Sequence, residues 1–130
     1  MLKITKTAEY ALIAIKHMSN IESLCSSSYI ANQYNIPKEI MAKTLQKLSR
    51  KNYINAIRGP KGGYSIKNSI KNVNLIQFIE DIEGPVGISQ CSTNEDCNLI
   101  NCCNIKDPIN KINRNIKNIL SKVKLKDIAF

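Results

Sequence analysis

The chain has 130 residues and a formal net charge of +9, with 19 Lys and Arg against 10 Asp and Glu. This length suits one domain, or one small domain with an extension, and a hydrophobic content of 43% is sufficient for a core. No run of about 18 apolar residues occurs, and the N-terminal residues lack the apolar segment of a signal peptide. We therefore expect a cytoplasmic protein without a membrane partner, and the positive charge indicates a polyanionic partner.

The first predicted helix begins after Thr5 or Thr7, either of which can cap it, and ends near Ser19. Its expected buried stripe consists of apolar residues at helical spacing: Ala8, Ala11, Leu12, Ile15 and Met18. Glu9 lies off this stripe in the first turn, where the helix dipole favours a carboxylate. His17 is the single histidine of the chain, and a lone histidine on a helix is more often a surface or packing residue than a ligand.

Two further helices are predicted, with a tight turn between them. Ser27 or Ser28 can cap the first, which is expected over about residues 29–34, and Pro37 opens the second. The second helix is expected to bury Ile40, Met41, Leu45 and Leu48. Its other faces carry polar and charged side chains: Lys38, Glu39, Lys43, Thr44, Lys47 and Arg50. This arrangement is typical of a helix-turn-helix whose second helix contacts DNA.

A hairpin is predicted directly after these helices. Residues 53–57 form the expected first strand, the sequence RGPKGG forms the turn, and residues 64–66 begin the returning strand. Residues 38–71 contain nine Lys and Arg and one acid, which leaves +8 on the predicted second helix and hairpin. We therefore expect a winged helix-turn-helix that binds double-stranded DNA. The candidate DNA-binding residues are Ser28, Lys38, Glu39, Lys43, Thr44, Lys47, Arg50, Arg58 and Lys61.

A segment rich in cysteine spans residues 84–108. It follows a predicted helix over residues 75–83, which Asn72 or Asn74 caps and which Gly84 ends. It holds four of the five cysteines of the chain: Cys91, Cys97, Cys102 and Cys103. Three of them give a C-x5-C-x5-C pattern. Thiolates around a soft metal centre would explain so long a loop, and the odd number of cysteines argues against a purely disulfide framework.

The last predicted helix begins at Asp107-Pro108. Its apolar residues repeat at near-heptad spacing: Ile109, Ile112, Ile116, Ile119, Leu120 and Val123. Such a stripe on the last helix of a small domain favours a homodimer. The expected fold is mainly α with a small β-hairpin wing. We divide it into a winged helix-turn-helix over residues 1–83, a cluster-binding loop over 84–108, and a dimerisation helix with its tail over 109–130.

Four stretches together resemble the Rrf2 (Rrf-two) family of bacterial winged-helix transcriptional regulators. They are the N-terminal ITKTAEYAL, the wing RGPKGGY, the helix-ending IEGP and the C-x5-C-x5-C loop. The resemblance implies an iron–sulfur cluster, [2Fe–2S] or [4Fe–4S], held by Cys91, Cys97 and Cys103. It also implies a homodimer, with repression as the expected activity, that reads a roughly palindromic operator through residues 38–47 and Arg58.

The fourth cluster ligand differs among members of that family. IscR-like members place a histidine three residues after the third cysteine, where this chain has Lys106. NsrR-like members use a carboxylate from the first helix of the other subunit, and Glu9 matches that position. Cys102 could exchange with Cys103 or be a bystander, and Cys25 is expected to be structural.

Other functional classes fit the residues less well. The main alternative is a regulator of the same fold that carries no cluster and switches through a disulfide among Cys91, Cys97, Cys102 and Cys103. Zinc is disfavoured because no C-x2-C pair is present. A ferredoxin-type electron carrier would have no use for the basic helix and wing. An enzyme is not expected, because the chain has one histidine, no nucleophile motif and no phosphate-binding loop.

Overall fold

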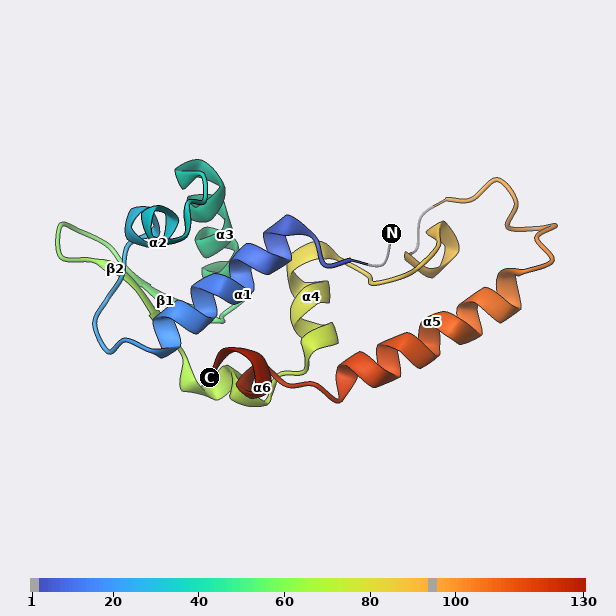
Figure 1. Cartoon of the computed structure of the whole chain (residues 1–130). Helices are drawn as coiled ribbons and strands as arrows, with labels where there is room; N and C mark the ends of the chain where they lie inside the picture. The colour runs from blue at the N-terminus through green and yellow to red at the C-terminus, as the bar shows by residue number, and fades with distance from the viewer. Residues whose placement is uncertain (1–2, 94–95) are drawn as a thin grey trace. The chain divides into compact units, whose positions relative to one another are not determined.

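The computed structural model describes residues 3–93 and 96–130, and these form two compact units (Figure 1). The winged-helix unit consists of residues 4–72 and 125–130, and the cysteine unit consists of residue 3 and residues 73–124. The winged-helix unit contains α1, α2, α3, the strands β1 and β2, the short helix η1 and the terminal α6. The cysteine unit contains α4, η2 and α5.

Helix α1 (Lys6–Ser19) is the central helix of the winged-helix unit. Thr5 caps it, because its backbone is extended and its side-chain oxygen accepts a hydrogen bond from the Ala8 amide at 3.2 Å. The buried side of the helix consists of Ala8, Ala11, Ala14, Ile15 and Met18. Leu12, which the sequence places in this stripe, is half-buried. The small alanines let neighbouring elements approach α1 closely, and α1 contacts α3, β2 and α6.

The helix-turn-helix is formed by α2 (Ser27–Tyr34) and α3 (Lys38–Arg50), which pack on each other. Asn35 adopts the left-handed conformation with φ of 54°, and the Ile36 amide donates to the Ala31 carbonyl at 2.9 Å. Two residues, Asn35 and Ile36, therefore separate α2 from Pro37, whose φ is fixed and which directly precedes α3. The predicted turn and both helices are confirmed.

The wing is a two-stranded antiparallel hairpin of β1 (Ile54–Ile57) and β2 (Gly63–Ile66), in which Ile54 pairs with Ile66 and Ile57 with Gly63. The short helix η1 (Asn68–Asn72) follows it. With three helices before it, the hairpin confirms the predicted winged-helix arrangement.

The last residues of the chain return to α1 and η1 as α6 (Leu125–Ala129). Leu125 and Ala129 are buried, and the Ser19 hydroxyl donates a hydrogen bond to the Ala129 carbonyl. Lys16 donates to the Ile128 carbonyl at 3.3 Å. The sequence pattern does not predict this helix, and its contacts with α1 account for its burial.

In the cysteine unit, α4 (Leu75–Glu83) packs against α5 (Lys106–Ser121). Asn74 caps α4 by accepting from the Gln77 amide at 2.8 Å, and Gly84 ends the helix with a φ of +90° that favours glycine. Both ends of α4 therefore match the prediction. The 3₁₀ helix η2 (Gln90–Thr93) contacts α5.

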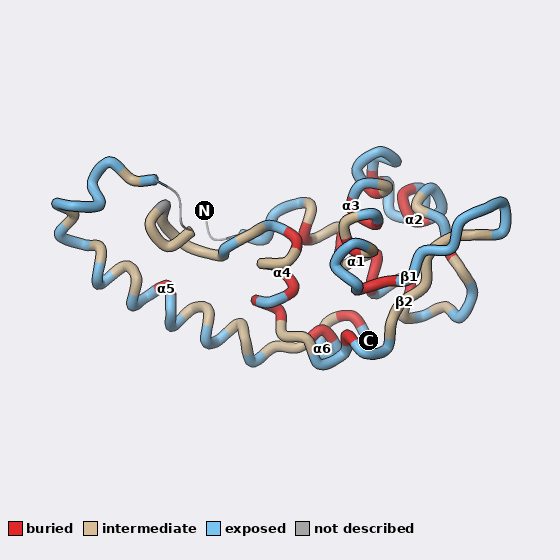
Figure 2. The backbone as a smooth tube through the Cα atoms, turned by 180° about the vertical axis from the view of Figure 1, so that it is seen from behind, coloured by how far each residue is buried: buried red, intermediate tan, exposed pale blue. Residues whose placement is uncertain are grey.

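The apolar stripe of α5 is only partly covered by the described residues. Asn113 is the only buried residue that this helix carries among the described residues, and Figure 2 shows the rest of α5 exposed or half-buried. Ile112 is 47% exposed and Ile119 is 65% exposed. Separately, no helix of the described residues is long and apolar enough to cross a membrane.

Candidate nucleic-acid interface and cysteine loop

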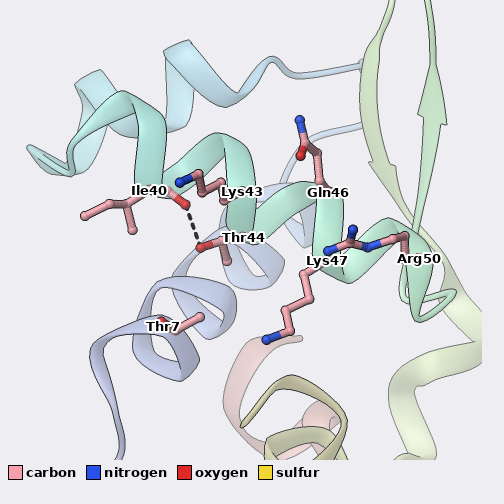
Figure 3. A pocket seen from close by; sticks show the side chains of 7 residues that line it. All are labelled: Thr7, Ile40, Lys43, Thr44, Gln46, Lys47 and Arg50. Atoms are coloured by element: carbon pink, nitrogen blue, oxygen red, sulfur yellow. Dashed lines mark hydrogen bonds between the residues drawn. The ribbon is translucent and has the colours of Figure 1, made fainter.

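The outward side of α3 carries most of the candidate DNA-binding side chains. Lys38, Glu39, Lys43 and Arg50 are exposed, and Lys47 is half-buried. A hollow of about 420 Å³ lies along this helix (Figure 3). Its lining comes from α3 and the first turn of α1: Thr7, Ile40, Lys43, Thr44, Gln46, Lys47 and Arg50. Three cations around one hollow provide an attractive site for phosphate groups.

Two placements on α3 differ from the prediction. Thr44, expected on an outer face, is 2% exposed, and its hydroxyl donates to the Ile40 carbonyl at 2.8 Å. Ile40, expected in the core, is 42% exposed. The reason is the position of the buried stripe, which runs through Met41, Thr44, Leu45 and Leu48. Thr44 falls inside this stripe, and the hydrogen bond to its own helix satisfies the buried hydroxyl.

The cap of α2 also differs from the prediction. Ser26, rather than Ser27 or Ser28, has the extended backbone of a cap, and its hydroxyl accepts from the Tyr29 amide at 3.1 Å. Ser28 is exposed in the first turn of α2. Its role in DNA binding stays a prediction. Thr7 and Gln46 line the hollow but were not identified from the sequence, although the helical spacing of Lys43, Gln46 and Arg50 indicates a shared face.

The wing is attached to the segment before α2 through backbone hydrogen bonds. Cys25 and Tyr64 exchange two of them, at 3.0 and 2.8 Å. Gly63 makes this approach possible, because a Cβ there would lie 3.0 Å from the Cys25 carbonyl oxygen. Arg58 and Lys61, the candidate contacts of the wing, are both exposed in the turn. The backbone bonds at Gly63-Tyr64 therefore attach β2 to the segment before α2, while the two cations remain accessible.

The beginning of the cysteine loop is docked on α4 and α5 by side-chain hydrogen bonds. The Val86 amide donates to Glu80 Oε2 at 3.2 Å, and Lys117 Nζ binds the same oxygen at 3.4 Å. The Ile88 amide donates to Asn113 Oδ1 at 3.2 Å. Residues 86–88 are thus held by polar groups of both helices.

Cys91 has two polar neighbours. Its Sγ lies 3.2 Å from the Ser89 hydroxyl and 3.8 Å from Asn110 Oδ1 on α5. Gly87 lies close to η2, where a Cβ would come within 2.8 Å of atoms of Ser92 and Thr93. The sequence pattern indicates Cys91 but none of these neighbours. Asn110 is distant from Cys91 in sequence, and only the folded unit brings the two together.

All five cysteines are free thiols, so no disulfide joins the described residues. In the loop, Cys91, Cys97 and Cys103 are half-buried and Cys102 is exposed. Cys25 is buried beside the wing, and its burial raises the pKa of its thiol. No three His, Cys, Asp or Glu side chains among the described residues are grouped so that they could hold a metal ion. The three candidate ligands fit an iron–sulfur cluster by donor type, as half-buried free thiols on one loop.

Glu9, the expected fourth ligand, and His17, the single histidine of the chain, both have local partners. Glu9 Oε2 forms an ion pair with Lys6 Nζ at 2.9 Å on the exposed start of α1, and this bond raises the pKa of Lys6. His17 Nδ1 lies 2.9 Å from the Tyr34 hydroxyl, and its ring contacts the rings of Tyr29 and Tyr34. His17 Nε2 is buried without a hydrogen-bond partner among the described residues. The local contacts of His17 are those of a packing residue.

Comparison with known proteins gives one family and one fold. The sequence model of the family described as "Rrf2: Iron-dependent Transcriptional regulator" matches residues 4–130. CymR, the global cysteine regulator of B. subtilis, is similar in structure, with a TM-score of 0.74 and 21% identity over 99% of this chain and 97% of that one.

Two further solved structures share the fold. The oxidized form of Staphylococcus aureus CymR has a TM-score of 0.71 and 19% identity, over 98% of this chain and 96% of that one. IscR from T. potens has a TM-score of 0.70 and 20% identity, over 97% of this chain and 85% of that one. At these identities the structural similarity establishes the winged-helix fold.

Proposed function

The chain belongs to the Rrf2 family of transcriptional regulators, and we propose that it binds operator DNA as a homodimer under the control of its cysteine loop. The observation that carries the DNA-binding part is the hollow along α3 with its three cations, Lys43, Lys47 and Arg50. The exposed Arg58 and Lys61 of the wing provide a second positive site. An arginine at the tip of a wing is suited to a narrow minor groove.

The dimer is supported by the exposed residues of the apolar stripe on α5. Ile112 and Ile119 expose apolar surface at near-heptad spacing, which a second copy of the same helix would bury. A homodimer with two recognition helices would read two half-sites separated by about one helical turn of DNA.

Control is assigned to an iron–sulfur cluster on Cys91, Cys97 and Cys103. Their spacing, their free thiol state and the family description as iron-dependent support this proposal. Such a cluster would supply redox and ligand-exchange chemistry when it is bound. The chain's own residues hold the start of the loop in place through Glu80 and Asn113, and they surround Cys91 with the polar groups of Ser89 and Asn110.

Glu9 is the proposed fourth ligand, supplied across the dimer. It is partly exposed at the start of α1, and its ion pair with Lys6 would have to open when the carboxylate binds iron. Glu9→Ala should leave the fold and the dimer intact and shorten the lifetime of the cluster. His17→Ala is the matched comparison, and if it alone destroyed the spectrum, the ligand assignment would pass to His17.

A thiol switch is the second candidate, and the free, exposed Cys102 beside Cys103 favours it. The two candidates are separated by purifying the protein without oxygen and measuring its iron, its acid-labile sulfide and its visible spectrum. Iron and sulfide in stoichiometric amounts support the cluster. A colourless protein that forms a disulfide among the loop cysteines under mild oxidation, with a change in DNA affinity, supports the switch.

A further inference from the structure

We infer that Ile40 is a specificity-determining residue that reads the C5-methyl group of thymine in the major groove. The inference rests on the proposed DNA-binding function and deepens it. It starts from a departure from the sequence pattern, because Ile40 is 42% exposed although helical spacing alone places it in the core.

The position of Ile40 in α3 is the first argument. The helix begins at Lys38, so Ile40 lies in its first turn. In helix-turn-helix proteins the N-terminal residues of the recognition helix are those that contact base edges. Ile40 also lines the hollow with Lys43, Lys47 and Arg50, so phosphates attracted to these cations would bring DNA to the same surface (Figure 3).

The chemistry of the hollow is the second argument. Of the seven residues that line it, Ile40 is the only one with a purely apolar side chain. Among the groups that base pairs present in the major groove, the thymine methyl is the apolar one, and aliphatic side chains contact it. If this basic surface binds DNA, the thymine methyl is therefore the group in the major groove that the Ile40 side chain can recognise.

The neighbouring Thr44 strengthens this assignment. Its hydroxyl donates to the Ile40 carbonyl at 2.8 Å, and the residue is 2% exposed. The Thr44 hydroxyl is therefore engaged within the helix and does not donate to a base. The apolar contact at this part of the hollow is left to the aliphatic side chain of Ile40.

The test is a double-mutant cycle between one side chain and one methyl group. A duplex is first selected from a random library by binding to the wild-type protein. Each thymine of its half-sites is then replaced, one at a time, by deoxyuridine, which removes only the C5-methyl. Wild-type protein should lose about fourfold in affinity per half-site at one thymine position, as expected for one buried methyl group. Ile40→Ala should lose a similar factor on the thymine duplex and show no further loss on the matching uracil duplex.

Lys43→Ala provides the control. Because it removes a positive charge and no methyl contact, this variant should lose the same factor in affinity on the thymine duplex and on the uracil duplex. Thermal unfolding of Ile40→Ala verifies that the variant is folded. If no duplex is enriched, the proposed function itself fails. If wild-type protein binds a selected duplex, but Ile40→Ala loses the same factor with thymine and uracil at every position or loses nothing, the methyl contact is wrong while DNA binding stands.

Discussion

The two units of this chain differ in how completely each forms its own structure. The winged-helix unit has 12 Lys and Arg against 4 acids, +8, whereas the cysteine unit has 7 against 6, +1. The buried side chains divide unequally too. Among the described residues of the cysteine unit, only four residues of α4 and Asn113 of α5 are buried. The winged-helix unit is therefore a self-contained basic domain, whereas the cysteine unit exposes apolar residues and thiols that need partners.

This difference indicates a division of roles. A basic surface on a packed core suits a fixed contact with DNA, because the side chains are already positioned before binding. A helix with exposed isoleucines on its apolar stripe suits association with a second chain, and a loop of free thiols suits a response to iron or to oxidants. The predictions below test whether the two units can be altered independently.

The largest effect is expected from the loop cysteines. Cys97→Ala should abolish bound iron and sulfide, because a cluster with three protein thiolates cannot lose one without losing its hold. Cys91→Ala and Cys103→Ala should do the same. Cys102→Ala is the matched control within the loop and should keep the cluster. Iron and sulfide analysis of anaerobically purified proteins measures this, and a cluster that survives in Cys97→Ala would remove that residue from the ligand set.

A large effect is also expected on the α5 stripe. Ile119→Glu should weaken the dimer by about 100-fold or more, because an unpaired carboxylate in an apolar seam costs about 3 kcal/mol or more. Ile119 is 65% exposed in the single chain, so the fold of the monomer should be little affected. Asn118→Glu adds the same charge on an exposed polar neighbour and should leave the dimer intact. Sedimentation equilibrium distinguishes the outcomes, and an undisturbed Ile119→Glu dimer would place the interface elsewhere.

A moderate effect is expected at the hollow. Lys47→Ala should reduce the slope of log affinity against log salt by about 0.9 per lost phosphate contact, on every duplex alike. Lys126→Ala, which removes an exposed lysine of α6, is the charge-matched control and should leave the slope unchanged. Titrations at several salt concentrations provide the measurement. Equal slopes for wild type and Lys47→Ala would exclude Lys47 from the interface.

The smallest effect contrasts one cysteine of each unit. Burial raises the pKa of Cys25, so this thiol keeps its proton in the folded protein at a pH where it would ionise in the unfolded chain. Its contribution to stability is therefore complete below the unfolded pKa of about 8.5 and is lost as pH rises through the folded value. Alkylation mapped by mass spectrometry near pH 8 should modify the exposed Cys102 well before Cys25. Equal alkylation rates for Cys25 and Cys102 would show that burial does not protect the thiol of Cys25.

The sequence predicts the fold well because its local signals agree with one another. Asn74 and Gly84 mark both ends of α4, and Pro37 marks the start of α3, since caps and proline act within a few residues. Hydrophobicity alone predicts a buried Ile40 and an exposed Thr44, and the structure shows the reverse. A threonine can be buried when its hydroxyl bonds the carbonyl four residues earlier, and hydrophobic periodicity does not include this.

Other features could not be predicted because they depend on contacts between residues that are far apart in the sequence. Helix α6 has five residues, too few for a periodic pattern, and its burial depends on α1. The neighbours of Cys91 depend on the packing of η2 against α5. Spacing alone can suggest these thiols as ligands, but it cannot predict which side chains lie beside Cys91. The dimer and the cluster involve partners outside the chain and stay proposals.

We propose that the state of the cysteine loop changes the affinity of the winged-helix unit for DNA. Fluorescence anisotropy of one selected duplex measures it directly, with anaerobically purified protein before and after iron is removed by a chelator. We predict that the affinity of wild type changes by between about fivefold and 150-fold, the usual range of coupling between two sites. Cys97→Ala should bind with the affinity of the iron-free wild type and should not respond to the chelator. The same affinity for wild type with and without iron would show that the loop does not control DNA binding.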